Sequence, residues 1–275
     1  MIEPTDKLGL PSDAFLSRQF ADVLVERHGH LLEVTLNRPD SYNALHSAAH
    51  YQLHEIWDDF ERDPDLWVAI VTGAGDRAFC SGNDLKVTAK GGDMSMPSSG
   101  FGGLCSRLNR EKPIIAAVNG VAMGGGMEIA LSCDLIVAAD TAKFALPEVK
   151  VGLFAAAGGV QRLTRQIGRK AAMELILTGK HILAQEALAL GIINQCVPAG
   201  KVMEAARALA ETILGNSPTA IRASKAALNK LDEIESLKDV LKSSEPIFAK
   251  LFYTNDFKEG IAAFTEKRKP EWTGT

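Results

Sequence analysis

The sequence predicts an α/β core followed by an all-helical C-terminal layer. Through residues 66–197, short buried strands, glycine-containing turns and helical stretches follow one another as recurring units. From residue 201 onwards the pattern changes to alanine-rich or amphipathic helices with few strand signals. We therefore expect an irregular tail over residues 1–20, an α/β core over 21–198 and a helical layer over 199–275.

The composition is that of an ordinary globular protein. The 275 residues are 46% hydrophobic and 23% charged, and the net charge of −4 comes without a block of basic residues, so nucleic acid is not an expected partner. No apolar run approaches the ~18 residues that span a bilayer, and the N-terminus lacks the pattern of a signal peptide, so no membrane partner is expected. Four widely spaced cysteines without a C-x-x-C pair indicate reduced thiols and a cytoplasmic location.

The first predicted elements are a hairpin, a helix and a buried strand. Two short apolar runs, Val23–Glu26 and Leu31–Leu36, flank a turn and predict the hairpin. A helical pattern extends from Asn43 to Glu61, and Pro64 follows it. The apolar run Val68–Thr72 predicts the strand.

Loops dominate the next stretch. Residues 73–82 are rich in turn formers, and residues 88–103 are rich in Gly, Ser, Met and Pro, so we expect a mobile loop beside any site there. A helix is predicted from Leu104 to Glu111, ahead of Pro113.

The central stretch of the chain reads as a strand, a glycine turn and a helix N-terminus. The apolar run Ile114–Val118 is short and bounded by turn formers, which is typical of a buried strand. Three consecutive glycines, Gly124–Gly126, are costly in backbone entropy, so the fold must need a bare backbone there. Glu128 falls in the first turn of the helix that follows, whose free N–H groups we expect to point into a pocket.

The remaining elements follow from the same patterns. The core continues with two strands and three short helices, and the C-terminal layer consists of helices alone. The predicted strands are Leu135–Ala139 and Ile192–Val197, and the predicted helices are Val160–Ile167, Lys170–Thr178, Ala184–Leu190, Lys201–Leu214, Pro218–Lys230, Leu237–Thr254 and Phe257–Arg268.

Two carboxylates are the first candidates for chemistry. Glu128 and Glu148 both lie in apolar, glycine-rich surroundings, where partial desolvation raises the pKa of a carboxyl group towards neutrality. Each acid alone is more often a helix-start or surface residue. A catalytic role for the pair is favoured because two segments, Gly124–Gly126 and the loop Ser81–Asn83, can each supply a backbone N–H donor. Two such N–H groups aimed at one point make an oxyanion hole.

A metal site is a weaker possibility. His46, His50 and His54 recur every four residues on a predicted helix, but no second histidine follows at the spacing of an H-E-x-x-H motif. A solvated or trimming face of the helix is the favoured interpretation, and no metal ligand is assigned.

The ordered motifs resemble the enoyl-CoA hydratase/isomerase (crotonase) superfamily over roughly residues 20–270. The motifs are Asn37-Arg-Pro39 with Asn43-Ala-Leu45, Ala78 to Leu85, Ala117 to Gly120 with Gly124 to Glu128, and Phe144 to Glu148 with Gly152 and Gly158 to Leu163. The resemblance implies a spiral of repeated β-β-α units, C-terminal helices that form trimers or hexamers, and an acyl-CoA thioester substrate. It implies no metal or redox cofactor, because CoA enters as part of the substrate.

The resemblance also assigns roles residue by residue. The oxyanion donors fall on the N–H groups of Asn83 and Gly125, and the acid/base pair falls on Glu128 and Glu148. Lys86 matches a position near the CoA phosphates. The further substrate- or CoA-binding positions are Ala44, Ser81, Gly82, Asp84, Gly124, Pro147, Phe264 and Lys267, the last two from a C-terminal helix that can belong to a neighbouring subunit.

Retention of both acids favours an enoyl-CoA hydratase over an isomerase, which commonly keeps the second acid alone. In this interpretation Glu128 deprotonates water for attack on Cβ, and Glu148 supplies the proton to Cα. Two departures alter the pocket, namely Asn83 in place of a small residue and the stretch Leu153–Gly159, which remodels the wall behind the acyl chain.

Several alternatives remain open. Residues 100–104 and 259–274 look most like the carnitinyl-CoA dehydratase branch, and other crotonase reactions include double-bond isomerisation and C–C cleavage. A non-catalytic acyl-CoA- or RNA-binding member of the fold is a distant alternative, and a metal-dependent hydratase would rest on the three histidines alone.

Overall fold

The centre of the fold is a six-stranded sheet with the strand order β1-β2-β3-β5-β7-β10. The computed structural model describes residues 18–234 and 236–275, so most of the expected tail lies outside the described residues. β1 pairs with β2 in the predicted hairpin, and the other neighbours are parallel. The strands are β1 (Val23–His28), β2 (Leu31–Leu36), β3 (Val68–Gly73), β5 (Ile114–Val118), β7 (Leu135–Ala139) and β10 (Gln195–Val197).

A second, four-stranded sheet has the order β4-β6-β8-β9. Its first three strands are parallel to one another, and the fourth is antiparallel to β8. These strands are only two or three residues long, and they are β4 (Ala78–Cys80), β6 (Val121–Met123), β8 (Lys143–Ala145) and β9 (Ile182–Leu183).

The two sheets are built from repeated β-β-α units, as the resemblance implied. In each unit the first strand joins the large sheet, the second joins the small sheet, and a helix follows. The units are β3-β4 with α3 (Leu85–Ala89), β5-β6 with α4 (Gly125–Ser132) and β7-β8 with α5 (Gly159–Ile167). Repetition of this unit winds the chain into a spiral.

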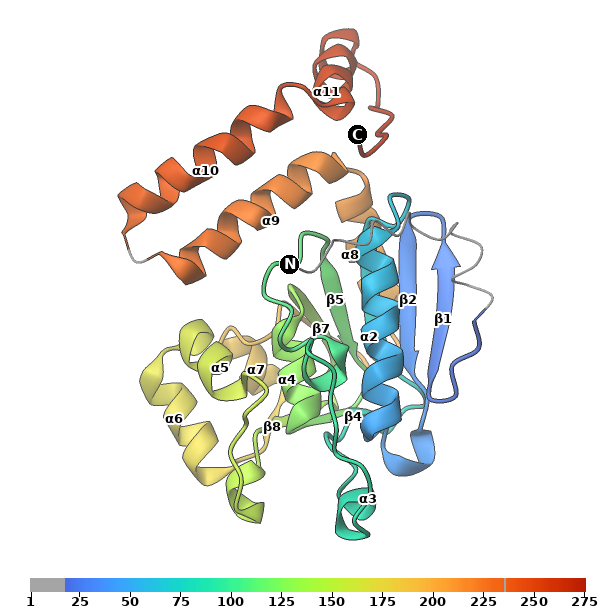
Figure 1. The fold of residues 1–275 in the computed structure, drawn as a ribbon, viewed down its shortest axis with the longest axis vertical. Helices are drawn as coiled ribbons and strands as arrows, with labels where there is room; N and C mark the ends of the chain where they lie inside the picture. The colour runs from blue at the N-terminus through green and yellow to red at the C-terminus, as the bar shows by residue number, and fades with distance from the viewer. Residues whose placement is uncertain (1–17, 235) are drawn as a thin grey trace, which may run out of the picture.

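The remaining helices cover the sheets or project from them (Figure 1). α8 packs against β3, β5 and β7, whereas α9 and α10 lie side by side and extend away from the sheets towards α11. The helices are α2 (Ser47–Arg62), α6 (Arg169–Thr178), α7 (Ala184–Ala189), α8 (Val202–Leu214), α9 (Pro218–Glu233), α10 (Leu237–Leu251) and α11 (Asn255–Glu266), and the 3₁₀ turns are η1 (Pro39–Ser41), η2 (Phe101–Gly103) and η3 (Glu148–Val151). No helix in the described ranges is long and apolar enough to cross a membrane.

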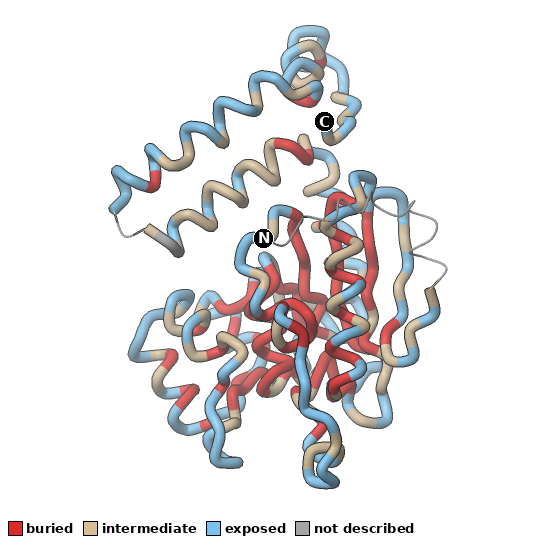
Figure 2. Tube along the Cα trace, viewed as in Figure 1, coloured by how far each residue is buried: buried red, intermediate tan, exposed pale blue. Residues whose placement is uncertain are grey.

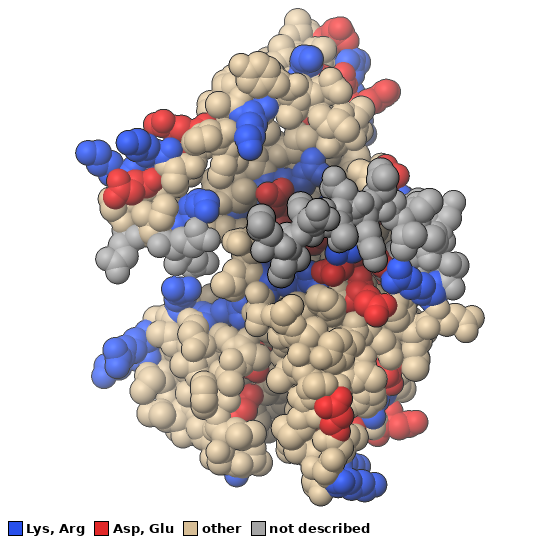
Figure 3. Space-filling view, viewed as in Figure 1, with Lys and Arg blue, Asp and Glu red and all other residues tan. Residues whose placement is uncertain are grey.

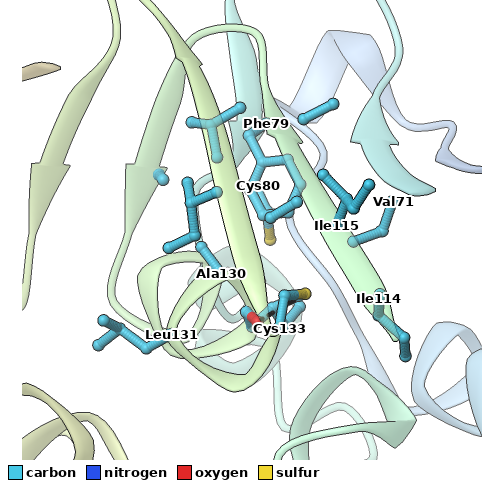
Figure 4. Packing of buried hydrophobic residues seen from close by; sticks show 14 of the residues in the cluster. Val71, Phe79, Cys80, Ile114, Ile115, Ala130, Leu131 and Cys133 are labelled. Atoms are coloured by element: carbon cyan, nitrogen blue, oxygen red, sulfur yellow. Dashed lines mark hydrogen bonds between the residues drawn. The ribbon is translucent and has the colours of Figure 1, made fainter. Parts of the chain in front are cut away.

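The apolar core lies between the sheets and the helices that cover them (Figure 2). Every residue of β3 and β5 is buried, which is typical of parallel strands covered on both faces. Figure 4 shows side chains of β4 (Phe79, Cys80), β5 (Ile114, Ile115) and α4 (Ala130) gathered in one cluster. On the face seen in Figure 3, acidic and basic side chains are interspersed.

Two helix predictions were wrong. The helix expected from Asn43 begins at Ser47 instead, because Asn43 has a left-handed backbone (φ 53°) and His46 caps the helix. Residues 104–111 form turns and not a helix. The Ser106 N–H donates to the carbonyl of Ser99, and the Arg162 side chain donates to the carbonyl of Cys105. These backbone groups therefore do not form helical hydrogen bonds.

Candidate active site

One pocket contains most of the predicted site residues. Its cavity volume is about 320 Å³. The lining residues are Ser47, His50, Ser81, Gly82, Asn83, Leu85, Met94, Met96, Phe101, Gly124, Gly125, Glu128, Pro147, Glu148, Lys150, Val151, Leu153, Phe154, Ala156 and Ala157.

The topology of the small sheet explains why these residues meet. Residues 81–83 directly follow β4, Gly124 and Gly125 follow β6, and Pro147 and Glu148 follow β8. Because β4, β6 and β8 are parallel neighbours, their carboxyl ends lie at one edge of the sheet. This is the edge at which parallel α/β sheets commonly bind ligands.

Two backbone N–H groups are available at this edge. Gly125 is the first residue of α4, and the first N–H groups of a helix have no intrahelical acceptor. Leu45 holds the loop after β4, since its N–H donates to the Gly82 carbonyl and its carbonyl accepts from Asp84. The Asn83 N–H lies between these two hydrogen bonds in the chain and takes part in neither of them. A Cβ built on Gly82 would lie 3.2 Å from the Gly125 nitrogen, so the two loops touch.

The triple glycine meets three separate steric demands. Gly124 has φ 53°, and a Cβ there would lie 3.0 Å from Oε1 of Glu148. A Cβ on Gly125 would overlap the ring of Phe101, and one on Gly126 would overlap the carbonyl of Cys80. The bare backbone expected from the sequence therefore lets α4 start against β4 and against the pocket.

Glu128 is a buried carboxyl group that accepts hydrogen bonds from backbone N–H groups. Its side chain is 3% exposed, and the Gly159 N–H donates to Oε1 at 2.9 Å. Burial, with a smaller contribution from repulsion by Glu148, raises the pKa of Glu128 to about 7, against the lowering effect of the backbone hydrogen bonds from Gly159 and Ala157. Glu128 can therefore exchange a proton near neutral pH.

Glu148 lies in a different environment. It follows Pro147 at the start of η3 and is half-buried. Its Oε2 is sealed from solvent and has no hydrogen-bond partner among the described residues, and burial raises the pKa of this carboxyl too. An unpartnered buried oxygen favours the protonated acid, whereas the N–H donated to Glu128 favours a carboxylate.

The pocket wall is largely apolar. Met94 and Met96 from the loop before η2, and Leu153 and Phe154 from the stretch after η3, line it and are each more than half exposed. The loop predicted to lie beside the site does so. Ser47 at the start of α2 anchors it by donating to Asp93 at 2.7 Å.

His50 was not predicted as a site residue, and its assignment to a solvated helix face was wrong. It is 2% exposed and lines the pocket, and burial and then His46 lower its pKa to about 4. His46 instead caps α2, and His54 contacts Ser99. The recurrence every four residues was the available signal, since it places all three on one face of the helix.

Three other predicted residues lie outside the pocket lining. Asp84 caps α3 and pairs with Arg38 at 3.0 Å, and the carbonyl of Ala44 accepts from the same Arg38 at 2.5 Å. Lys86 is exposed on α3, next to the lining residue Leu85. Asp84 and Ala44 thus hold the loops on which the pocket depends.

The C-terminal candidates are not brought to the pocket within one chain. Phe264 lies on α11 with 86% of its surface exposed, and Lys267 is the C-cap of that helix. Neither lines the cavity. The side chain of Asn83 makes a hydrogen bond within its own segment, because its Nδ2 donates to the Thr88 hydroxyl at 3.0 Å.

The one side-chain cluster in the described ranges that has metal-ligand spacing lies on the hairpin. It consists of Glu26, His28 and Glu33. Arg207 donates to both carboxylate oxygens of Glu33 at 2.7 Å, so the buried acid is already paired with a guanidinium group.

Comparison with known proteins shows a family match over most of the chain. A family model described as enoyl-CoA hydratase/isomerase matches residues 26–275. The chain is 43% identical over 257 residues to a mevalonyl-coenzyme A hydratase of Beauveria bassiana, covering 88% of this chain and 91% of that protein. It is 40% identical over 253 residues to a carnitinyl-CoA dehydratase of Escherichia coli K12, covering 90% and 97%.

Solved structures agree with the sequence comparison. The crystal structure of an enoyl-CoA hydratase from Mycobacterium tuberculosis H37Rv superposes with a TM-score of 0.88 at 42% identity, covering 92% of this chain and 99% of that one. A carnitinyl-CoA hydratase from Mycobacterium avium superposes with a TM-score of 0.74 at 42% identity, covering 94% and 100%.

Proposed function

The chain belongs to the enoyl-CoA hydratase/isomerase family, and we propose that it acts as an enoyl-CoA hydratase, adding water reversibly to a trans-2-enoyl-CoA to give the 3-hydroxyacyl-CoA. The observation that supports this most is the presence of two carboxyl groups, Glu128 and Glu148, on one pocket beside two backbone donors. Family members that shift a double bond need one such acid, whereas addition of water needs both a base and an acid.

The proposed mechanism uses protein groups and water alone. The N–H groups of Asn83 and Gly125 bind the thioester oxygen and stabilise the negative charge that develops on it. Glu128, as the carboxylate, takes a proton from water while the water oxygen bonds to Cβ. Glu148, as the acid, gives its proton to Cα. Proton exchange with solvent water then restores both groups.

The test is the loss of enoyl-thioester absorbance with crotonyl-CoA. We expect rapid loss with the native chain and a fall of about 10²-fold or more in kcat for Glu148→Gln, because general acid catalysis contributes on that order. Glu211→Gln, on the exposed surface of α8, is the matched control and should be unchanged. Full activity in Glu148→Gln would disprove the role of this acid.

A second candidate is dehydration or hydration of a more substituted acyl group, of the kind named for the carnitinyl-CoA and mevalonyl-coenzyme A relatives. Phe101 and Phe154 line the cavity together with the two acids, and aromatic and acidic groups favour a quaternary ammonium ion. If crotonyl-CoA binds without hydration and crotonobetainyl-CoA is turned over, this second candidate replaces the first. Mass analysis of the product separates hydration from isomerisation and C–C cleavage.

A further inference from the structure

We propose that His50 determines specificity in this pocket by donating a hydrogen bond from Nε2 to an oxygen of the acyl chain. The enzyme would then favour acyl groups that have a hydroxyl or carbonyl oxygen beyond Cβ over plain alkyl chains. This inference rests on the proposed function and goes further by naming the class of acyl group.

The position of His50 places it beyond the thioester. The Phe101 ring occupies the space beside Gly125, where a Cβ would overlap it. His50 packs edge-on against that same ring, with 4.5 Å between the ring centroids and an interplanar angle of 60°. His50 therefore lies one aromatic ring away from the proposed oxyanion donor, along the wall of the cavity.

The hydrogen bond of the ring defines its tautomer. The Gly102 N–H donates to Nδ1 of His50 at 3.1 Å. Because the lowered pKa keeps this imidazole neutral at physiological pH, its single proton must be on Nε2. The ring thus presents a fixed N–H donor.

That donor has no partner within the described ranges, 18–234 and 236–275. The polar side-chain atoms there that are sealed from solvent and make no hydrogen bond belong to Asp59, Glu61, Arg110 and Glu148. Nε2 of His50 is not one of these sealed atoms. The open side of the ring therefore faces the cavity that His50 lines. A donor without an acceptor is costly once a substrate fills a largely apolar pocket, and a substrate oxygen would satisfy it.

Neighbouring polar groups are already engaged. The Ser47 hydroxyl donates to Asp93 at 2.7 Å, and the Asn83 amide donates to Thr88 at 3.0 Å. Lys150 is exposed at the mouth of the pocket. Two neutral side-chain donors in the lining remain. The Ser81 hydroxyl lies in the loop after β4, next to the proposed oxyanion donor Asn83, whereas His50 lies on α2 beside Phe101.

The experiment compares enoyl thioesters that differ by one isosteric replacement. The pairs are 4-hydroxy-2-butenoyl-CoA with 2-pentenoyl-CoA, and 5-hydroxy-2-pentenoyl-CoA with 2-hexenoyl-CoA, in which a hydroxyl replaces a methyl group. We expect kcat/KM to favour the hydroxylated member of at least one pair by about tenfold, which is the usual worth of one hydrogen bond. Crotonyl-CoA is assayed in parallel, so absence of any hydratase activity is distinguished from absence of a preference.

Two variants separate recognition from support of the loop. His50→Asn keeps an acceptor at the Nδ1 position for Gly102 and removes the donor into the cavity. His50→Gln places an amide donor at the Nε2 position and removes the acceptor for Gly102. We expect the preference to vanish in His50→Asn and to persist in His50→Gln, even if the latter has a lower melting temperature.

Equal kcat/KM values for both members of each pair in the native enzyme would overturn the proposal. A preference that survives unchanged in His50→Asn would overturn it as well, because the oxygen would then be recognised by another group.

Discussion

Glu128 and Glu148 have the same chemistry, and their surroundings distinguish them. Glu128 receives the Gly159 N–H on one oxygen, whereas Glu148 has an oxygen without a partner in the described part of the chain. Both carboxyls have raised pKa values because burial disfavours their charge, and repulsion from Glu148 contributes to the raised pKa of Glu128. The proposed base and acid therefore differ in how fully their carboxyl oxygens are hydrogen-bonded.

The raised pKa of Glu128 predicts a stability effect with a definite sign. Between its ordinary value of 4.5 and about 7, the folded protein binds more protons than the unfolded chain, so stability falls as the pH rises through this window. Glu128→Gln lacks this loss. We expect the variant to be more stable than the native chain at pH 8, by up to about 3 kcal/mol, and to gain little at pH 5.

Urea unfolding at the two pH values measures this difference at a fixed protein concentration. Glu211→Gln on the exposed surface of α8 is the control and should change stability equally at both pH values. An equal gain at pH 5 and pH 8 in Glu128→Gln would mean that the carboxyl is not strained by burial.

At the scale of elements, the contact of α4 with β4 decides where the site forms. α4 begins directly after β6, and its Gly126 approaches the carbonyl of Cys80 so closely that a side chain has no room. The same approach places the first N–H of the helix beside the loop that follows β4. The position of α4 and the closeness of the Gly125 N–H to the loop after β4 therefore have one structural cause.

Gly126→Ala tests this contact. The added methyl group would meet backbone atoms that cannot move independently, so we expect a loss of about 2 kcal/mol or more and a lower melting temperature. Gly215→Ala at the end of α8 is the matched control, since its φ is −68° and its nearest contact is 3.5 Å away. The control should change stability by less than about 0.5 kcal/mol. Equal melting temperatures for the two variants would show that α4 can shift without cost.

At the scale of the whole molecule, the helices α10 and α11 expose large apolar side chains. The most exposed among them are Tyr253 between the helices and Phe264 on α11, at 84% and 86%. Patches of this kind mark interaction surfaces. We propose that the chain assembles into a homotrimer or hexamer, in which these helices meet a neighbouring subunit.

Assembly makes a prediction for Phe264. If α11 of one subunit reaches the CoA of another, Phe264→Ala should raise KM for the CoA thioester several-fold with little change in kcat, while Phe264→Leu should retain most of the affinity. Light scattering gives the oligomeric state of each variant. A native chain that is monomeric and fully active would contradict the assembly and the role of Phe264 together.

The sequence by itself determined the elements whose signals are local. Apolar runs bounded by turn formers predicted β3, β5 and β7, because parallel strands that are buried on both faces need no alternation. The triple glycine and Glu128 predicted a helix start with an acid in its first turn, which the structure has. The ordered motifs also indicated the family and the spiral of β-β-α units.

Only the tertiary structure decided which residues meet. The strands β4, β6 and β8 are three residues long, which is too short for a periodic signal, yet their parallel pairing brings three distant loops to one edge. The burial of His50 depends on Phe101 and Gly102, about 50 positions away along the chain. Contacts between residues so far apart cannot be predicted from local sequence patterns. The pocket wall and the N–H donor of His50 could therefore be identified only from the tertiary structure.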